Sequence, residues 1–129
     1  MRMRAERLLP ACLLAYAAAS LLHHIHNAEF LAEYPNMPAW LTREKVYLVW
    51  LGETLIGAAG YVLVRAGHRA AGSLLIGLYA LAGFGGLDHY AVAPFSAHTA
   101  TMHFTIALEV VAAAFLLFTV ALKWRTTST

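Results

Sequence analysis

Residues 8–22, LLPACLLAYAAASLL, form an apolar run that leads directly into the polar segment HHIHNAE at residues 23–29. The run carries no charged residue and covers most of a membrane span, since a helix needs about 20 apolar residues to cross the hydrocarbon core. No glycine or proline separates the run from the histidines, so the helix is expected to continue through them. The stretch predicts a membrane helix with polar groups near one end.

The composition of the whole chain agrees with membrane insertion. Apolar residues make up 60% and charged residues 12% of the 129 residues, whereas soluble domains contain about half and a quarter. Three further segments are long and apolar enough to cross, which gives predicted spans at about 7–33, 46–66, 70–91 and 97–123. Because short loops join these spans, we predict one domain, residues 1–129, folded as an all-α, up-down-up-down four-helix bundle in the lipid bilayer.

Charge and cysteine content narrow the class of protein further. A net charge of +2, with no basic patch, argues against a nucleic-acid partner, and a single cysteine, Cys12, excludes a disulfide. Seven of the nine basic residues lie on one side of the predicted bundle, which places both termini in the cytoplasm and the chain in the cytoplasmic, or bacterial inner, membrane. These seven are Arg2, Arg4, Arg7, Arg65, Arg69, Lys123 and Arg125.

Ionisable residues collect at the opposite ends of the spans. Six of the seven histidines and every carboxylate except Glu6 fall in this outer half, and all four spans contribute to it. Ionisable groups are costly in hydrocarbon unless they are paired or hydrated, so we predict that they share one polar chamber. The candidate catalytic residues are Glu53 and Glu109. The candidate metal ligands are His23, His26, Glu29, Asp88, His89, His98 and His103.

Helical geometry assigns some of these residues to common faces. At about 100° per residue, an arc of roughly 120° on the first span holds His23, His26, Glu29 and Glu33. His24 and Asn27 are expected to point elsewhere. One face of the last span holds His98, Met102, Thr105 and Glu109. His103 lies about a third of a turn from that face, facing either the chamber or a neighbouring subunit.

Histidine and carboxylate groups from several helices are the ligands that zinc, iron and manganese prefer. Di-metal sites in helical bundles use Glu-x-x-His, and residues 26–29 carry the reverse order with the same spacing. We therefore predict a metal-binding membrane protein, and a metal-dependent enzyme, whose site near the outer leaflet acts on a lipid-soluble or periplasmic substrate. The plainer interpretation is that His26 and Glu29 form a hydrogen-bonded pair that only stabilises the bundle.

Three other classes of function stay open. Two histidines on facing helices would suit a b-type haem, although haem pockets contain fewer carboxylates. Chains of Glu and His also carry protons in pumps, but the inner half of the spans is nearly free of polar groups. Finally, the chain could be a non-catalytic subunit or assembly factor within a homo-oligomer or a larger membrane complex.

Two segments resemble a known family. HNAEFLAEYPNMPAWL, residues 26–41, is similar to small bacterial membrane proteins that carry an H-x-x-E-E motif late in the first hydrophobic helix. HYAVAPFSAHTATMHF, residues 89–104, resembles that family's second histidine region. The motif maps to His26 and Glu29, whereas Phe30 replaces its second Glu, for which Glu33 is a candidate substitute. The resemblance implies a metal-dependent role and supplies no reaction.

Overall fold

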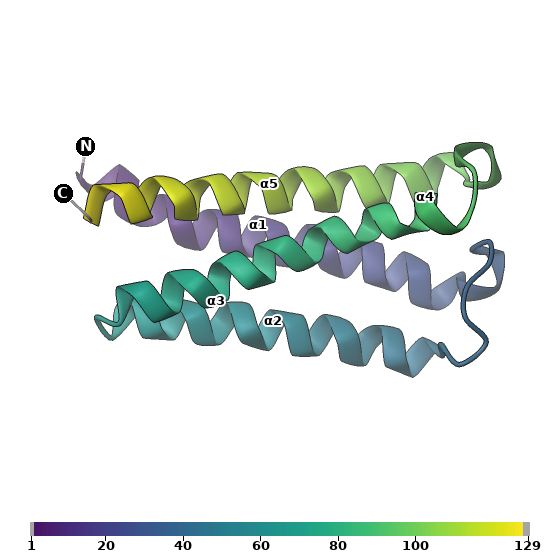
Figure 1. The fold of residues 1–129 in the computed structure, drawn as a ribbon, viewed down its shortest axis with the longest axis horizontal. Helices are drawn as coiled ribbons and strands as arrows, with labels where there is room; N and C mark the ends of the chain where they lie inside the picture. The colour runs from purple at the N-terminus through teal and green to yellow at the C-terminus, as the bar shows by residue number, and fades with distance from the viewer. Residues whose placement is uncertain (1, 128–129) are drawn as a thin grey trace.

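The computed structural model describes the backbone of residues 2–127 and the side chains of residues 7–124. Residues 2–127 contain helices and no strand, and four antiparallel spans bring both ends of the chain to the same end of the bundle (Figure 1). The α-helices are α1 (Arg2–Glu29), α2 (Arg43–Arg65), α3 (Arg69–Ala82), α4 (Asp88–Val92) and α5 (Ala100–Thr127). The predicted all-α four-helix bundle is confirmed.

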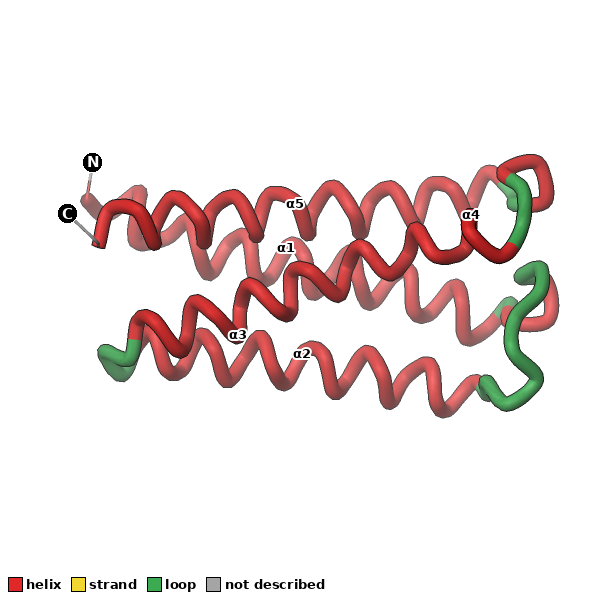
Figure 2. The backbone as a smooth tube through the Cα atoms, in the orientation of Figure 1, coloured by secondary structure: helices red, strands yellow, loops and turns green. Residues whose placement is uncertain are grey.

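The two ends of the bundle differ in what they carry. The terminal end carries both chain ends and the turn between α2 and α3. The loop end, on the opposite side in Figure 2, carries the connections at residues 30–42 and 93–99, in which green loop segments alternate with short red 3-10 turns. The spans between these ends are long and apolar enough to cross a membrane: Arg7–Glu29, Arg43–Arg65, Arg69–Val92 and Ala100–Trp124.

The structure shifts the end of the first predicted span and the start of the last, and it interrupts the third. The first helix ends at Glu29 and is followed by a 3-10 turn, Leu31–Glu33, which stops at Tyr34 because the residue before Pro35 favours an extended conformation. The third span is interrupted by a second 3-10 segment, Gly83–Leu87, between α3 and α4. The last helix begins at Ala100, where Thr99 Oγ1 accepts a hydrogen bond from the Met102 N–H at 3.3 Å.

Glycines bring α2 and α3 together. A Cβ at Gly60 would lie 2.8 Å from the Gly72 carbonyl oxygen, so only hydrogen side chains allow this approach of the two backbones. The turn that joins the two helices ends α2 with Gly67 at φ 95°, and the His68 N–H donates to the Leu63 carbonyl at 2.9 Å. The two helices therefore form a closely packed hairpin.

The remaining seam, between α1 and α5, completes the core. Buried residues that pack together on this side and against α3 are Leu9, Tyr16, Ile76, Tyr79, Ala80, Ala113, Leu116 and Val120. Large apolar side chains cover the outside, including Leu14, Leu48 and Phe115. Such a surface is suited to contact with lipid rather than water.

Candidate functional site

The centre of the candidate site is Glu109, in the first half of α5. Its side chain is 3% exposed, and two imidazoles of α1 face its carboxylate. His23 Nε2 lies 3.7 Å from Glu109 Oε2, and His24 Nδ1 lies 3.8 Å from Glu109 Oε1. A buried carboxylate thus lies between two imidazoles inside a predominantly apolar bundle.

The inward face of α1 differs from the predicted arc. Tyr16, Ser20, His23 and Asn27 are all buried, and their spacing of four, three and four residues makes one continuous stripe. Asn27 Nδ2 donates to His89 Nε2 at 3.2 Å. The prediction that His24 and Asn27 point away from the site is therefore wrong. The predicted arc was centred on the glutamates at the helix end, whereas the buried stripe indicates the true inward direction.

Hydrogen bonds fix the proton on one nitrogen of each imidazole. The Thr105 hydroxyl donates to the Met102 carbonyl at 3.2 Å, so its oxygen accepts from His23 Nδ1–H at 3.4 Å. His24 Nδ1–H donates to the Ser20 carbonyl at 2.9 Å. Consequently His23 Nε2 turns a lone pair, or a second proton, toward Glu109.

The break in the third span makes room for the carboxylate. Gly86 belongs to the 3-10 segment, and a Cβ there would lie 3.2 Å from Glu109 Oε2 and 3.8 Å from His23 Nε2. The first of these distances is tighter than an ordinary contact. The glycine therefore keeps space beside the two facing atoms, a feature that the sequence showed only as one glycine among many.

From this pair, imidazole rings continue toward the loop end. The ring centroid of His23 lies 5.7 Å from that of His24 and 5.5 Å from that of His89. The ring centroid of His98 in turn lies 6.2 Å from that of His89 and 5.8 Å from that of His103. We call these five residues the histidine chain. It joins α1, α4 and the start of α5, so three of the four spans meet in it.

Tyr34 covers the histidine chain from the connection after α1. Its ring lies 4.8 Å from that of His89, and its hydroxyl is hydrogen-bonded to His26 Nδ1 at 2.8 Å. Burial raises the pKa of Tyr34 to about 12, so the hydroxyl stays protonated at neutral pH. The same connection is tied to the end of α4, because Asn36 Nδ2 donates to the Val92 carbonyl at 2.8 Å.

Aromatic rings cover the other end of the histidine chain. His103 lies against Phe95 with a centroid distance of 3.7 Å and hydrogen-bonds the Tyr90 hydroxyl through Nδ1 at 2.8 Å. His98 Nδ1–H donates to the Pro94 carbonyl at 3.1 Å, while its buried Nε2 has no partner within the described part of the chain. His103, whose direction the sequence left open, thus faces His98.

Three predicted residues lie outside this arrangement. Glu29 is exposed and accepts from Arg43 at 2.7 Å and from the Tyr47 hydroxyl at 2.6 Å. Asp88 is exposed although its neighbour His89 is buried. Glu53 is half-buried on α2, near enough to Glu109 for the two charges to interact. The structure therefore brings together five of the predicted histidines with Glu109, and adds His24.

The donor atoms of the site meet the needs of a metal or of haem only in part. Among the described side chains, no three from His, Cys, Asp and Glu converge on one point as metal ligands. Two donors, His23 Nε2 and Glu109 Oε2, do face one another. Because the histidine rings contact each other, they offer less support to haem, whose axial ligands face each other across the porphyrin.

Comparison with known proteins adds no family assignment. No protein-family model, no curated protein and no solved structure matches the chain. The resemblance to the H-x-x-E-E proteins therefore stays a prediction, and the function has to be argued from the site itself.

Proposed function

We propose that this chain is a membrane-embedded enzyme that transfers protons to and from a lipid-soluble substrate, with Glu109 and His23 as the acid–base pair. The observation that carries the proposal is the buried Glu109 carboxylate, 3.7 Å from the free ring nitrogen of His23. Ionisable groups inside a membrane bundle are costly to bury and commonly mark functional sites. Paired titratable groups in a dry site are the usual means of general acid–base catalysis.

The hydrogen bonds indicate that the pair shares one proton. If Glu109 is ionised and His23 is neutral, a carboxylate faces a lone pair, which is unfavourable at low dielectric. One proton between Oε2 and Nε2 removes the repulsion, whichever atom holds it. Their 3.7 Å separation has to shorten by about 0.5 to 0.8 Å, to the usual N–H···O distance, for a hydrogen bond to form. A pair in this state can both accept and return a proton.

Nucleophilic catalysis by serine has less support. Ser20 Oγ lies 3.4 Å from His24 Nδ1, which resembles a nucleophile beside its base. However, that nitrogen carries the proton that it donates to the Ser20 carbonyl. It has no lone pair with which to accept the hydroxyl proton.

The proposal is tested by hydrogen–deuterium exchange next to a carbonyl group. The full-length protein in lipid nanodiscs is incubated in D₂O with 2-undecanone, and mass spectrometry follows deuterium at the carbons beside the C=O. The base removes one C–H proton to form the enolate, exchanges it with solvent and returns a deuteron to carbon. Glu109→Gln and His23→Gln are expected to lower the exchange rate by about a hundred-fold or more.

His68→Gln is the matched control, because His68 is exposed at the terminal end, away from Glu109. It is expected to leave exchange unchanged. The proposal fails if the wild-type protein exchanges no faster than empty nanodiscs, or if all three variants exchange at the wild-type rate.

A metal-dependent enzyme is the second candidate. It is favoured by the facing lone pairs of His23 Nε2 and Glu109 Oε2, with His24 3.8 Å from the same carboxylate as a third donor. His24 would first have to release the Ser20 carbonyl. Zinc, iron or manganese held there would act as a Lewis acid. Elemental analysis decides: folded, active protein that contains no metal and takes up none would exclude this candidate.

The proposal also includes the orientation of the chain in the membrane. We infer that both termini lie in the cytoplasm, because seven of nine basic residues belong to the terminal end, and that the chain resides in a bacterial inner membrane. Reporter fusions at each terminus test the orientation. Assembly into a homo-oligomer or a larger complex stays a prediction, which size measurement in detergent would test.

A further inference from the structure

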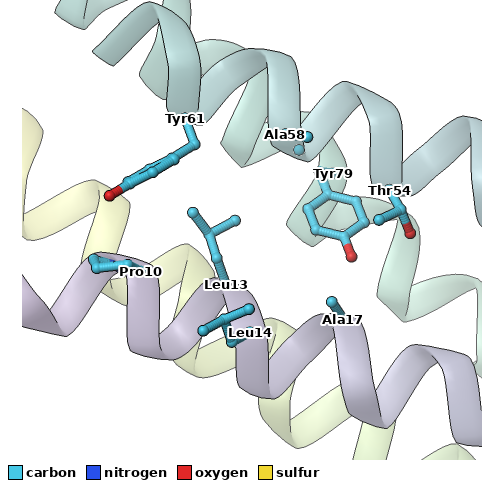
Figure 3. Close-up of a pocket in the computed structure, with 9 residues that line it drawn as sticks. Pro10, Leu13, Leu14, Ala17, Thr54, Ala58, Tyr61 and Tyr79 are labelled. Carbon is cyan, nitrogen blue, oxygen red and sulfur yellow. The ribbon is translucent and has the colours of Figure 1, made fainter. Parts of the chain in front are cut away.

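A second feature of the bundle is a cavity of about 280 Å³ between α1 and α2. Its walls include Leu13, Leu14 and Ala17 of α1, Thr54 and Ala58 of α2, and Tyr79 of α3 (Figure 3). The cavity is close in size to the smaller ligand pockets, which begin at about 300 Å³. Leu14 is 73% exposed and Ala58 is also exposed, so the cavity opens toward lipid rather than toward either aqueous side.

The Tyr79 and Thr54 hydroxyls lie at one end of this apolar cavity. Tyr79 is 2% exposed, and neither hydroxyl forms a hydrogen bond of good geometry among the described residues, although the two are close enough to interact with each other. Figure 3 shows both hydroxyls near the Ala17 end of the cavity. Even if one donated to the other, one O–H would still lack an acceptor. Buried donors without acceptors are unfavourable, so this end of the cavity suits a ligand that accepts hydrogen bonds.

The sequence holds the Tyr79 ring in this position. Gly57 faces the ring directly, and a Cβ at that position would overlap it. On its other side the ring contacts Tyr16, with centroids 4.5 Å apart. The Tyr79 hydroxyl is therefore held by its neighbours before any ligand arrives, which lowers the entropic cost of binding.

We propose that this cavity binds a lipid-soluble carbonyl compound, whose C=O accepts from the Tyr79 and Thr54 hydroxyls while its apolar body fills the space between α1 and α2. Access is lateral, from the hydrocarbon core, through the opening beside Leu14 and Ala58. As a binding site it stands apart from the histidine chain. As the site of a substrate it rests on the proposed function, since Tyr79 and Glu109 are near enough for electrostatic interaction.

The test uses 2-undecanone with ¹³C at the carbonyl carbon, titrated into the full-length protein in nanodiscs. Infrared spectroscopy follows the C=O stretch, because a hydrogen bond to the carbonyl oxygen lowers its frequency. We expect a shifted band that saturates. In the Tyr79→Phe, Thr54→Val double variant we expect that band to vanish and binding to weaken by about ten- to a hundred-fold.

Cavity filling provides a second variant with a matched control. Ala58→Leu narrows the cavity and should weaken binding, whereas Ala59→Leu, also exposed but outside the cavity, should not. Circular dichroism checks that each variant is folded. Glu109→Gln should keep the shifted band while losing proton exchange. If the wild-type protein binds 2-undecanone but does not exchange its protons, the proposed function is contradicted and this inference still holds.

Three outcomes would overturn the inference. One is a wild-type titration without a saturable shifted band. Another is a band that persists in the double variant. The third is equal displacement by undecane, which would mean that the cavity accepts only an acyl chain and does not recognise the carbonyl.

Discussion

The α2–α3 seam and the α1–α5 seam both join apolar spans of 23 to 25 residues, but they do so in different ways. Between α2 and α3, Gly60 and Gly72 let the two backbones touch. Between α1 and α5, side chains separate the helices, and near the loop end these include His23, Thr105 and Glu109. A seam built on backbone contact tolerates no added atoms. A seam built on polar side chains tolerates changes of size and depends on the matching of hydrogen bonds.

The strongest test of this comparison is Gly72→Ala. A Cβ at Gly72 would lie 2.7 Å from the Val64 backbone nitrogen, so the helices must separate. We expect a loss of about 3 kcal/mol in the free energy of unfolding, measured by SDS titration in mixed micelles. Gly77→Ala on the same helix meets nothing within 4 Å and should be neutral or slightly stabilising. Equal effects of the two variants would contradict the role of glycine in this seam.

The stability of the α1–α5 seam should fall when one member of the His23–Glu109 pair is removed. His23→Leu leaves the Glu109 carboxylate without its imidazole and Thr105 without its donor, so we expect a loss of about 2 kcal/mol. Adding Glu109→Leu should recover most of it, because neither polar group then remains buried. The same titration measures both variants. If the two substitutions simply add, the pair contributes nothing specific to the seam.

Much of the fold followed from the sequence because hydropathy marks the segments that are long and apolar enough to cross a membrane. The convergence of polar groups at one end was also predictable, since alternating spans bring their polar ends together. The inward direction of α1 was predictable too, from the spacing of Tyr16, Ser20, His23 and Asn27. The predicted inward face was wrong because it included Glu29, which is exposed at the helix end and pairs with Arg43.

Other parts of the site could not be predicted. The loop end folds back so that Tyr34 reaches His26, eight residues earlier in the chain. This contact depends on the path of the connection after α1, which carries no periodic pattern. Similarly, nothing in the run GFGGL says that Gly86 rather than Gly85 faces Glu109. Such choices depend on the local twist of a 3-10 segment and on packing between distant helices.

Gly86→Ala should have a smaller effect on stability than on chemistry. Its Cβ would lie 3.2 Å from Glu109 Oε2, so the carboxylate must shift by a few tenths of an ångström. We expect a loss of about 1 kcal/mol in the free energy of unfolding and a larger proportional fall in proton exchange with 2-undecanone. Gly85→Ala, whose Cβ would meet nothing within 4 Å, is the control. If both variants exchange at the wild-type rate, the space beside Glu109 has no function.

The smallest effect is expected for Arg43→Ala, which removes the ion pair with Glu29 at the loop end. The two side chains are 57% and 37% exposed, so water screens their attraction, and the loss in the free energy of unfolding should be smaller than that of Gly86→Ala. High salt should reduce it further in the same SDS titration. Proton exchange should not change, because Glu29 faces Arg43 and Tyr47 instead of the histidine chain. If Arg43→Ala lowered exchange as strongly as His23→Gln, Glu29 would belong to the reacting group, and the boundary drawn here between a buried acid–base pair and an exposed ion pair would be wrong.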